Sequence, residues 1–456
     1  MRRGTLKRSD KTIDSPLYVH TWAKDDYILA GQLTLQEAAT ANGIAAQFVY
    51  IEEYREDPDA YPLDPINLDF TPGIFTTTHP HITLGAIFDA APDAWGRRVI
   101  HANDRNLTAE QTFRSAFLRG ADGIGAIVLT SDPLADVTAL AKWSQRERPT
   151  LKQIDDAAIA ARRLEMDGSI PDELKHLLAG SWTIGGARPK AILQDLEARS
   201  VIAKFPSLNE NVNRNGIEWA SLQMARDMGF TVPDHKLISV STGQALVLGR
   251  FDRAGPTQSE RLHYVSAYSL ISKARESLKM DSAADVAVFS CGNLIDLAGR
   301  LATKPAAAKV NMFARLLLNA ALHNTDDHLK NFGFLKDPND ALHYSIAPVF
   351  DVSPQLSTDH YLHCADIGRN YTAAELLNQA PRLGIAPKAA QAAWDQMMPV
   401  LEKRADYYDE AGLTHAEINS VDKLFVQGVG KAGTLKPVVT ILKNKSTFHG
   451  PTPTLG

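Results

Sequence analysis

The residues of this chain that are best suited to chemistry lie together in the segment HNTDDHLKNFGFL, from His323 to Leu335. Asp326 and Asn331 have the D-x-x-x-x-N spacing of a kinase catalytic loop. In such a loop the aspartate accepts or orients the proton of the attacking hydroxyl, and the asparagine binds a magnesium ion. Asp327 lies one residue too close to Asn331. The spacing therefore selects Asp326 as the catalytic base and leaves Asp327 a supporting role.

Two other interpretations of this segment stay open at this point. A transition-metal site could use His323 and His328, although their spacing differs from the helical H-E-x-x-H pattern. A capped, solvated helix end would also carry these polar residues, because D-x-x-x-x-N arises often by chance. The remaining parts of a phosphate-transfer site therefore have to come from elsewhere in the chain.

A second metal-binding acid follows downstream. Asp351 comes directly after YSIAPVF, which we predict to be a short buried strand. It lies after the catalytic loop, in the order that a kinase needs for its second magnesium ligand. An acid after an apolar run can also simply begin a turn. Oxygen ligands from Asn331 and Asp351 would suit magnesium rather than zinc.

Two upstream segments could hold phosphate. LAGSWTIGGARPKAIL places Gly180, Gly185 and Gly186 before a predicted strand, where glycines let backbone N–H groups approach phosphate oxygens. It is not a Walker A sequence, and a plain hairpin turn is the alternative. Lys204 lies in the predicted strand RSVIAKFPS, where its charge needs a partner unless it points to solvent. A phosphate and Glu218, from the predicted helix NGIEWASLQMARDMG, would pair it as in protein kinases. The order of all these parts along the chain favours a kinase.

The elements that must position these residues form a strand-rich half followed by a helical half. We predict strands in 16–145 with a helix over AIFDAAPDAWGRRVIHAND, helices in 151–178, and strands with a glycine-rich turn in 179–252. Helices dominate 265–440, the clearest being AAAKVNMFARLLLNAALH. One face of that helix is expected to carry Val310, Phe313, Leu317 and Ala321. We divide the chain into an N-terminal strand-rich subdomain (1–145), a kinase N-lobe core (146–252), a helical C-lobe (253–440) and a flexible tail (441–456).

Composition excludes several classes of protein. The 456 residues are 44% hydrophobic and 22% charged, which is typical of a globular protein of two or three units. A net charge of −5 gives no global sign of nucleic-acid binding. Cys291 and Cys364 are far apart and indicate neither a disulfide framework nor a zinc cluster, so a reducing compartment fits best. Without a signal peptide or a long apolar run, we expect a cytoplasmic protein with no membrane contact.

Several motifs together resemble one family. NTDDHLKNFGFL followed by PVFDVSP resembles the signature of the HipA-type serine/threonine kinases, the toxins of bacterial HipBA-like toxin–antitoxin modules. GGARPKAIL, IAKFP, GFTVPDHKL and GRFDR recur in that family in this order, and PDAWGRR resembles its N-terminal region. The resemblance covers roughly residues 16–430. It implies an α+β, two-lobed protein-kinase-like fold with a strand-rich N-terminal subdomain and a mainly helical C-terminal lobe.

The resemblance also implies a role for each site residue, with ATP and Mg²⁺ as cofactors. Asp326 would be the catalytic base, with Asn331 and Asp351 binding magnesium. The ATP phosphates would contact Gly185, Gly186, Ala187, Arg188, Pro189, Lys190 and Lys204. The adenine side of ATP would contact Gly249, Arg250 and Phe251. From the catalytic loop, His328 and Lys330 would line the ATP site. The family phosphorylates itself just before the glycine loop, which here implies Thr183, with Ser181 as a second acceptor. Thr183 replaces the serine of many members, and a dianion there would repel ATP.

The resemblance implies partners as well. The best-known members phosphorylate an aminoacyl-tRNA synthetase, and their partner is a small helix-turn-helix antitoxin, HipB, that binds operator DNA. DNA contact would therefore be indirect for this chain. Two alternatives are kept: a small-molecule kinase, which uses the same catalytic parts, and a regulatory protein with an inactive kinase fold.

Overall fold

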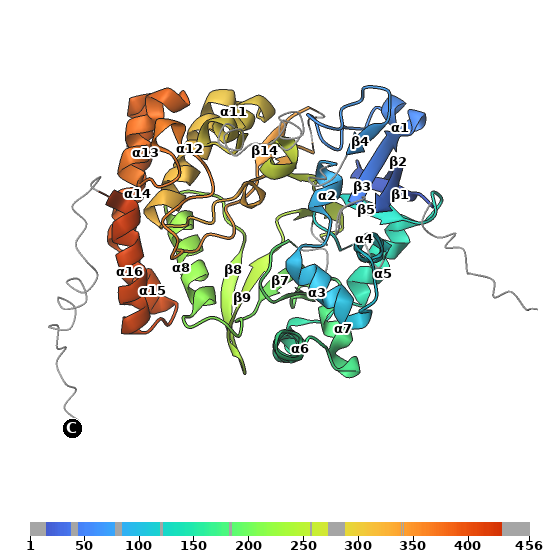
Figure 1. Cartoon of the computed structure of the whole chain (residues 1–456), viewed down its shortest axis with the longest axis horizontal. Helices are drawn as coiled ribbons and strands as arrows, with labels where there is room; N and C mark the ends of the chain where they lie inside the picture. The colour runs from blue at the N-terminus through green and yellow to red at the C-terminus, as the bar shows by residue number, and fades with distance from the viewer. Residues whose placement is uncertain are drawn as a thin grey trace, which may run out of the picture.

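The computed structural model describes residues 15–37, 44–77, 84–118, 122–181, 185–255, 258–271, 288–338, 340 and 342–430. A strand-rich part and a helical part lie at opposite sides of the molecule, as Figure 1 shows, with the sheet that carries β7 and β9 between them. The predicted tail, 441–456, lies outside the described residues. Within these residues no helix is long and apolar enough to cross a membrane.

The N-terminal part is built on an antiparallel sheet with the strand order β4-β3-β2-β1-β5. Its strands are β1 (Leu17–Ala23), β2 (Asp26–Glu37), β3 (Ile44–Tyr50), β4 (Phe75–Thr77) and β5 (Ile127–Thr130). Its helices are α1 (Glu52–Glu56), α2 (Ala86–Asp89), α3 (Ala94–Asn103), α4 (Ala109–Leu118) and α5 (Val137–Arg146). The single helix that we predicted over AIFDAAPDAWGRRVIHAND is wrong, because the chain breaks it between α2 and α3. Pro92 has no N–H to continue a helix, and Asp93 is extended.

A second sheet, with the order β6-β7-β9-β8, forms one wall of the candidate site. Its elements are β6 (Lys190–Gln194), β7 (Ser200–Lys204), α8 (Arg214–Asp227), β8 (His235–Val240) and β9 (Gly243–Gly249). The side chain of Asn213 caps α8 by accepting from Gly216 N–H. The sequence therefore placed Lys204 on a strand and Glu218 on a helix correctly.

The N-terminal part shares its packing with this second sheet. The helices η1 (Leu151–Gln153), α6 (Ile154–Asp167), η2 (Asp172–Leu174) and α7 (Lys175–Leu178) come between the two sheets in sequence. Trp95, Val99 and Ile100 of α3 lie in one buried cluster with residues of α6, α7, β6, β7 and β9. The division of the chain into units stays a prediction, but α3 packs with the second sheet rather than the first.

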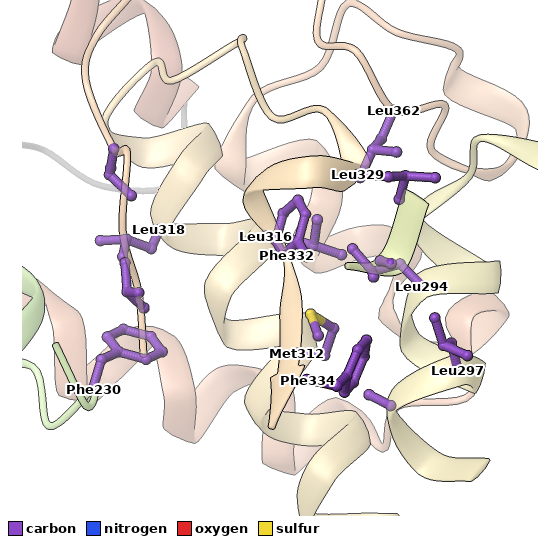
Figure 2. Packing of buried hydrophobic residues seen from close by; sticks show 14 of the residues in the cluster. Phe230, Leu294, Leu297, Met312, Leu316, Leu318, Leu329, Phe332, Phe334 and Leu362 are labelled. Carbon is purple, nitrogen blue, oxygen red and sulfur yellow. The ribbon is translucent and has the colours of Figure 1, made fainter. Parts of the chain in front are cut away.

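The C-terminal part is mainly helical, as predicted. Its elements are β10 (Arg253–Ala254), β11 (Glu260–Arg261), β12 (Tyr264–Ser266), α11 (Cys291–Leu301), α12 (Pro305–Ala321), η4 (Leu329–Asn331), β13 (Gly333–Lys336), β14 (Tyr344–Ile346), η5 (Ala365–Ile367), α13 (Ala373–Gln379), η6 (Ala380–Leu383), α14 (Pro387–Glu402), α15 (Arg404–Glu410) and α16 (His415–Val429). Helix α12 buries Phe313, Leu317 and Ala321 of its predicted face and half-buries Val310. Its core neighbours include Phe332 and Phe334, as Figure 2 shows.

The strand predicted over YSIAPVF is shorter than expected. Strand β14 ends at Ile346, and Pro348 has no N–H for a further ladder bond. The Val349 N–H instead donates at 2.8 Å to the carbonyl oxygen of Thr231, which lies in the segment between α8 and β8. This turn away from the sheet brings Asp351 toward the wall formed by β6–β9.

Candidate active site

One pocket collects most of the predicted site residues. The predicted residues that line it are Gly185, Gly186, Lys190, Lys204, Gly249, Arg250, Phe251, His328, Lys330, Asn331 and Asp351. They come from the glycine-rich loop (residues 185–190), from β6, β7 and β9, from the residues that follow β9, from the catalytic loop (His323–Asn331) and from the segment after β14. Segments nearly 150 residues apart along the chain, such as Lys204 and Asp351, therefore meet at one place.

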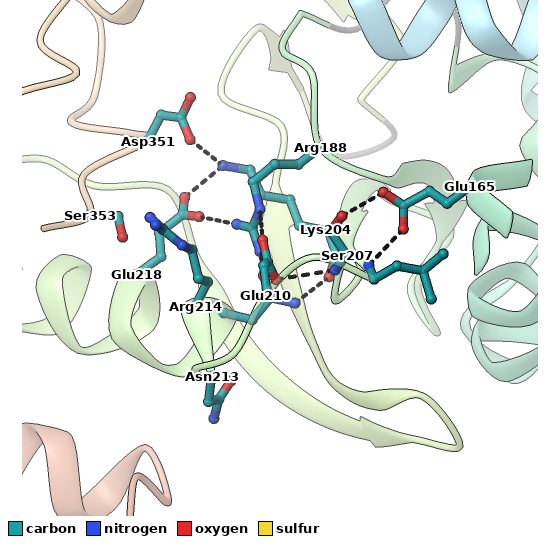
Figure 3. Close-up of polar contacts among 12 residues, drawn as sticks. Glu165, Arg188, Lys204, Ser207, Glu210, Asn213, Arg214, Glu218, Asp351 and Ser353 are labelled. Carbon is teal, nitrogen blue, oxygen red and sulfur yellow. Dashed lines mark hydrogen bonds and ion pairs between the residues drawn. The ribbon is translucent and has the colours of Figure 1, made fainter. Parts of the chain in front are cut away.

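Lys204 is the centre of the charged side of the pocket. Its Nζ atom lies 2.7 Å from Glu218 Oε1 and 2.8 Å from Asp351 Oδ1, and Figure 3 shows both contacts. Burial opposes the charge of Lys204, but Asp351 and Glu218 outweigh it and raise its pKa. The ion pairs hold the pKa of Asp351 well below its usual range, Lys204 being the main cause. The pairing expected between the strand lysine and the helix glutamate is thus present.

Lys190 adds a second cation beside the first. It is paired in register with Lys204 across β6 and β7 and is only 4% exposed. Burial, and then the positive charge of Lys204, lower the pKa of Lys190 to about 8. Its ammonium group donates to the carbonyl oxygen of Gly185. Two adjacent lysines lining one pocket favour an anionic ligand.

Asp351 adopts a backbone conformation that is rare for a residue with a side chain. Its φ is +56°. Such strained residues cluster at functional sites, where the surrounding structure holds them in place. Here the ion pair with Lys204 provides that restraint.

The two neighbouring aspartates of the catalytic loop have opposite environments. The side chain of Asp326 is 59% exposed, and its Oδ1 atom lies 3.9 Å from His328 Nε2. The amide nitrogen of Asn331 donates to the backbone oxygen of Asp326 at 2.9 Å, which joins the two ends of the motif. Asp327 is fully buried and accepts from His360 Nδ1 at 2.9 Å and from the Tyr361 N–H at 2.6 Å. This geometry agrees with an accessible Asp326 and a supporting Asp327.

The two histidines of the catalytic loop, His323 and His328, make different kinds of contact. His323 is buried, and its Nδ1 atom contacts the carbonyl oxygen of Gln355 at 2.9 Å. His328 packs its ring edge-on against Tyr361. Among the described residues, no cluster of three or more His, Cys, Asp or Glu side chains could hold a metal ion. The interpretation of His323 and His328 as a transition-metal pair is therefore not supported.

Apolar side chains also line the pocket. Phe251 packs against Phe350 with ring centroids 5.4 Å apart. Ile124, Ile202 and Leu248 line the same pocket. The side chain of Arg250 is tied to Asp252 by two hydrogen bonds of 2.9 and 2.7 Å. A pocket surface lined by aromatic and aliphatic side chains suits a flat aromatic base such as adenine.

Some predicted residues lie elsewhere. Ala187, Arg188 and Pro189 do not line the pocket. The Arg188 side chain instead makes two hydrogen bonds to Glu210, and a weaker ion pair to Glu218 at 3.5 Å. Thr183 lies outside the described residues. Ser181 is fully buried, and its hydroxyl donates to the carbonyl oxygen of Leu178 at 2.6 Å, so phosphorylation there would require this segment to move.

Sequence reasoning missed two acids of the N-terminal part. Asp89 and Asp93 both line the pocket. Asp89 is held by Ser266 and Ser269, while Asp93 contacts Gly186 and Lys330. The motif PDAWGRR was recognised only as part of a family resemblance. A polar residue between a proline and a helix was the only local signal, and it is also typical of an ordinary helix start.

Comparisons with known proteins show which proteins this chain is similar to. The family model of the HipA-like C-terminal domain matches residues 182–405. A Haemophilus influenzae protein named "Putative kinase" is 27% identical over 159 residues, which are 33% of this chain and 43% of that protein, so the match spans less than half of the relative's length. The structure of the complex of Shewanella oneidensis HipA, HipB and operator DNA contains a similar chain. The likeness has 18% identity, a TM-score of 0.60 and a coverage of 91% of this chain and 96% of that chain. The Helicobacter pylori proinflammatory kinase CtkA matches with 17% identity and a TM-score of 0.40, over 54% of this chain and 88% of its own.

The fold is a two-lobed α+β fold similar to that of the HipA chain. Residues 182–405, slightly less than half of the chain, are similar to the HipA-like C-terminal domain. The likeness to the HipA structure extends over nearly the whole chain, so the predicted HipA-type fold is confirmed.

Proposed function

We propose that this protein is an ATP- and Mg²⁺-dependent serine/threonine protein kinase of the HipA type. The position of Lys204 carries the proposal: its ammonium group is held between Glu218 and Asp351, at 2.7 and 2.8 Å, in a pocket that the catalytic loop also lines. Phosphoryl transfer depends mainly on positioning and on charge stabilisation, and this arrangement supplies both.

Each part of the pocket would then have one task. Lys204, Lys190 and the backbone of the glycine-rich loop would bind the phosphates, and the wall around Phe251 would take the adenine. Asp326 would accept the proton of the substrate hydroxyl. Its 59% exposed side chain lies where a hydroxyl of another protein can reach it.

Asn331 and Asp351 would hold the magnesium ion. Both offer oxygen ligands, which magnesium prefers. The amide nitrogen of Asn331 donates to Asp326, which leaves its carbonyl oxygen as the ligand atom. When bound, the ion would neutralise negative charge on the phosphates.

We further propose a toxin role, with a HipB-like helix-turn-helix antitoxin as partner, DNA contact only through that antitoxin, and a protein such as an aminoacyl-tRNA synthetase as substrate. Support comes from the HipA chain in the complex with HipB and operator DNA, whose fold this chain shares over 91% of its length. Co-expression with a HipB-like protein, followed by size-exclusion chromatography, tests the partner. Separate elution of the two proteins would contradict this part of the proposal.

The activity is tested by intact-mass spectrometry after incubation with magnesium and ATP, with Asp326→Ala as control. We expect the wild type alone to gain one phosphate, mapped to Thr183 or Ser181. Transfer to sugars or antibiotics but never to protein would instead indicate a small-molecule kinase. ATP binding without any turnover would indicate a regulatory protein with an inactive kinase fold.

A further inference from the structure

Asp93 joins the two sides of the pocket. It lies between α2 and α3, in the N-terminal part of the chain. Its Oδ2 atom accepts from the N–H of Gly186 at 2.8 Å, and its Oδ1 atom accepts from Lys330 Nζ at 2.7 Å. One carboxylate therefore ties the glycine-rich loop to the catalytic loop.

These two donors are of the kind that binds phosphate oxygens. A carboxylate resembles a phosphate in that it offers negatively charged oxygen acceptors to a backbone N–H and to an ammonium group. Gly186 has a φ of +97°, and a Cβ atom at this position would meet Lys190 Nζ at 2.5 Å. The loop conformation that Asp93 holds is thus one that needs glycine.

Asp93 carries a negative charge in this position. Trp95, two residues further along the chain, also contacts the glycine-rich loop. Burial opposes the charge of Asp93, but Lys330 and the Gly186 N–H outweigh it and lower its pKa. The Trp95 N–H donates to the carbonyl oxygen of Gly186 at 3.3 Å, and its indole Nε1 donates to Lys190 O at 2.9 Å. The Gly186 N–H of the loop thus already faces an internal anion.

We propose that Asp93 is a positioning residue that occupies the phosphate-binding donors of Gly186 and Lys330 until ATP displaces it. Its carboxylate and the triphosphate then compete for the same groups. This inference rests on the proposed ATP-dependent function. It predicts that removing the charge while keeping the shape strengthens the binding of ATP but not of adenosine, which has no phosphate.

The test is calorimetric titration of the full-length wild type, Asp93→Asn and Asp104→Asn with Mg-ATP and with adenosine. Asp104→Asn removes an exposed acid at the opposite end of α3 and is the matched control. The Asp93 side chain makes no capping hydrogen bond to α3, so its replacement leaves the helix start intact. We expect Asp93→Asn to bind ATP about tenfold more tightly, with adenosine affinity unchanged, because ATP no longer has to break a charge-assisted contact.

Unchanged or weaker ATP binding by Asp93→Asn, with normal adenosine binding, overturns the inference. Absence of ATP binding in the wild type overturns the proposed function instead. If Asp93→Asn also loses adenosine binding, its pocket has not folded, and Asp93→Ser then provides the same comparison of ATP with adenosine.

Discussion

The catalytic loop and the glycine-rich loop face the same pocket but are held in different ways. The catalytic loop is fixed within its own part of the chain: Asp327 accepts from His360 and Tyr361, and the Thr325 carbonyl accepts from the Tyr361 N–H at 3.1 Å. The glycine-rich loop is held by groups from α3 and by its own lysine. Contacts within the C-terminal part therefore hold the catalytic loop around Asp327, whereas the glycine-rich loop depends in part on the contact between Asp93 and the Gly186 N–H, which an anion can replace.

The largest effect should come from Asp326→Asn. We expect phosphate transfer to fall by about 100- to 10,000-fold, because the base is lost. The free energy of unfolding should not change, since the side chain is 59% exposed. A kinetic assay measures the rate of phosphate transfer, and a denaturant titration measures the free energy of unfolding. Asp359→Asn, an exposed acid of the same part of the chain, should leave both unchanged.

Asp327→Ala should act on stability instead. The change leaves the buried His360 side chain without the Asp327 acceptor and removes the shorter of the two hydrogen bonds that the Tyr361 N–H donates. We expect a loss of about 3 kcal/mol in the free energy of unfolding, measured by denaturant titration. An Asp327→Ala protein as stable as the wild type would contradict this structural role.

Glu218→Gln should weaken the positioning of Lys204. The variant keeps the shape but loses one of the two charges that hold the ammonium group. We expect the rate of transfer to fall by about 100-fold, because small misplacements at a reacting centre have such effects. Glu210→Gln is the matched control, since Glu210 binds Arg188 outside the pocket. Equal losses in the two variants would contradict a specific role for Glu218.

The smallest effect should be a pH dependence of ATP binding. The pKa of Lys190 is lowered to about 8, so its charge is present below that pH and lost above it. ATP affinity should therefore fall, by up to about tenfold, as the pH rises through 8. Bound phosphate would raise this pKa, so binding near pH 9 should take up a proton. Calorimetry in two buffers of different ionisation enthalpy measures the uptake, and Lys190→Met should abolish it.

Most of the predicted site residues were found from short-range patterns in the sequence. The D-x-x-x-x-N spacing, the lysine inside an apolar strand and the acid after an apolar run are all local patterns. Asn331, Lys204 and Asp351 line one pocket, and Asp326, which does not line it, is joined to Asn331 by a hydrogen bond. Asp93 could not be found in this way, because its partners Gly186 and Lys330 are 93 and 237 residues away. The end of β14 was also missed, since the contact that draws the chain away comes from Thr231.

The packing of α3 has a consequence for how such a chain can be inherited. The matched family domain begins at residue 182, yet Trp95, Val99 and Ile100 fill the core beneath its sheet. A recombination event that moved residues 182–405 alone would expose that apolar surface to water. A segment that can be exchanged with its core intact is therefore longer than residues 182–405, which match the family model. Such a segment starts at or before α3.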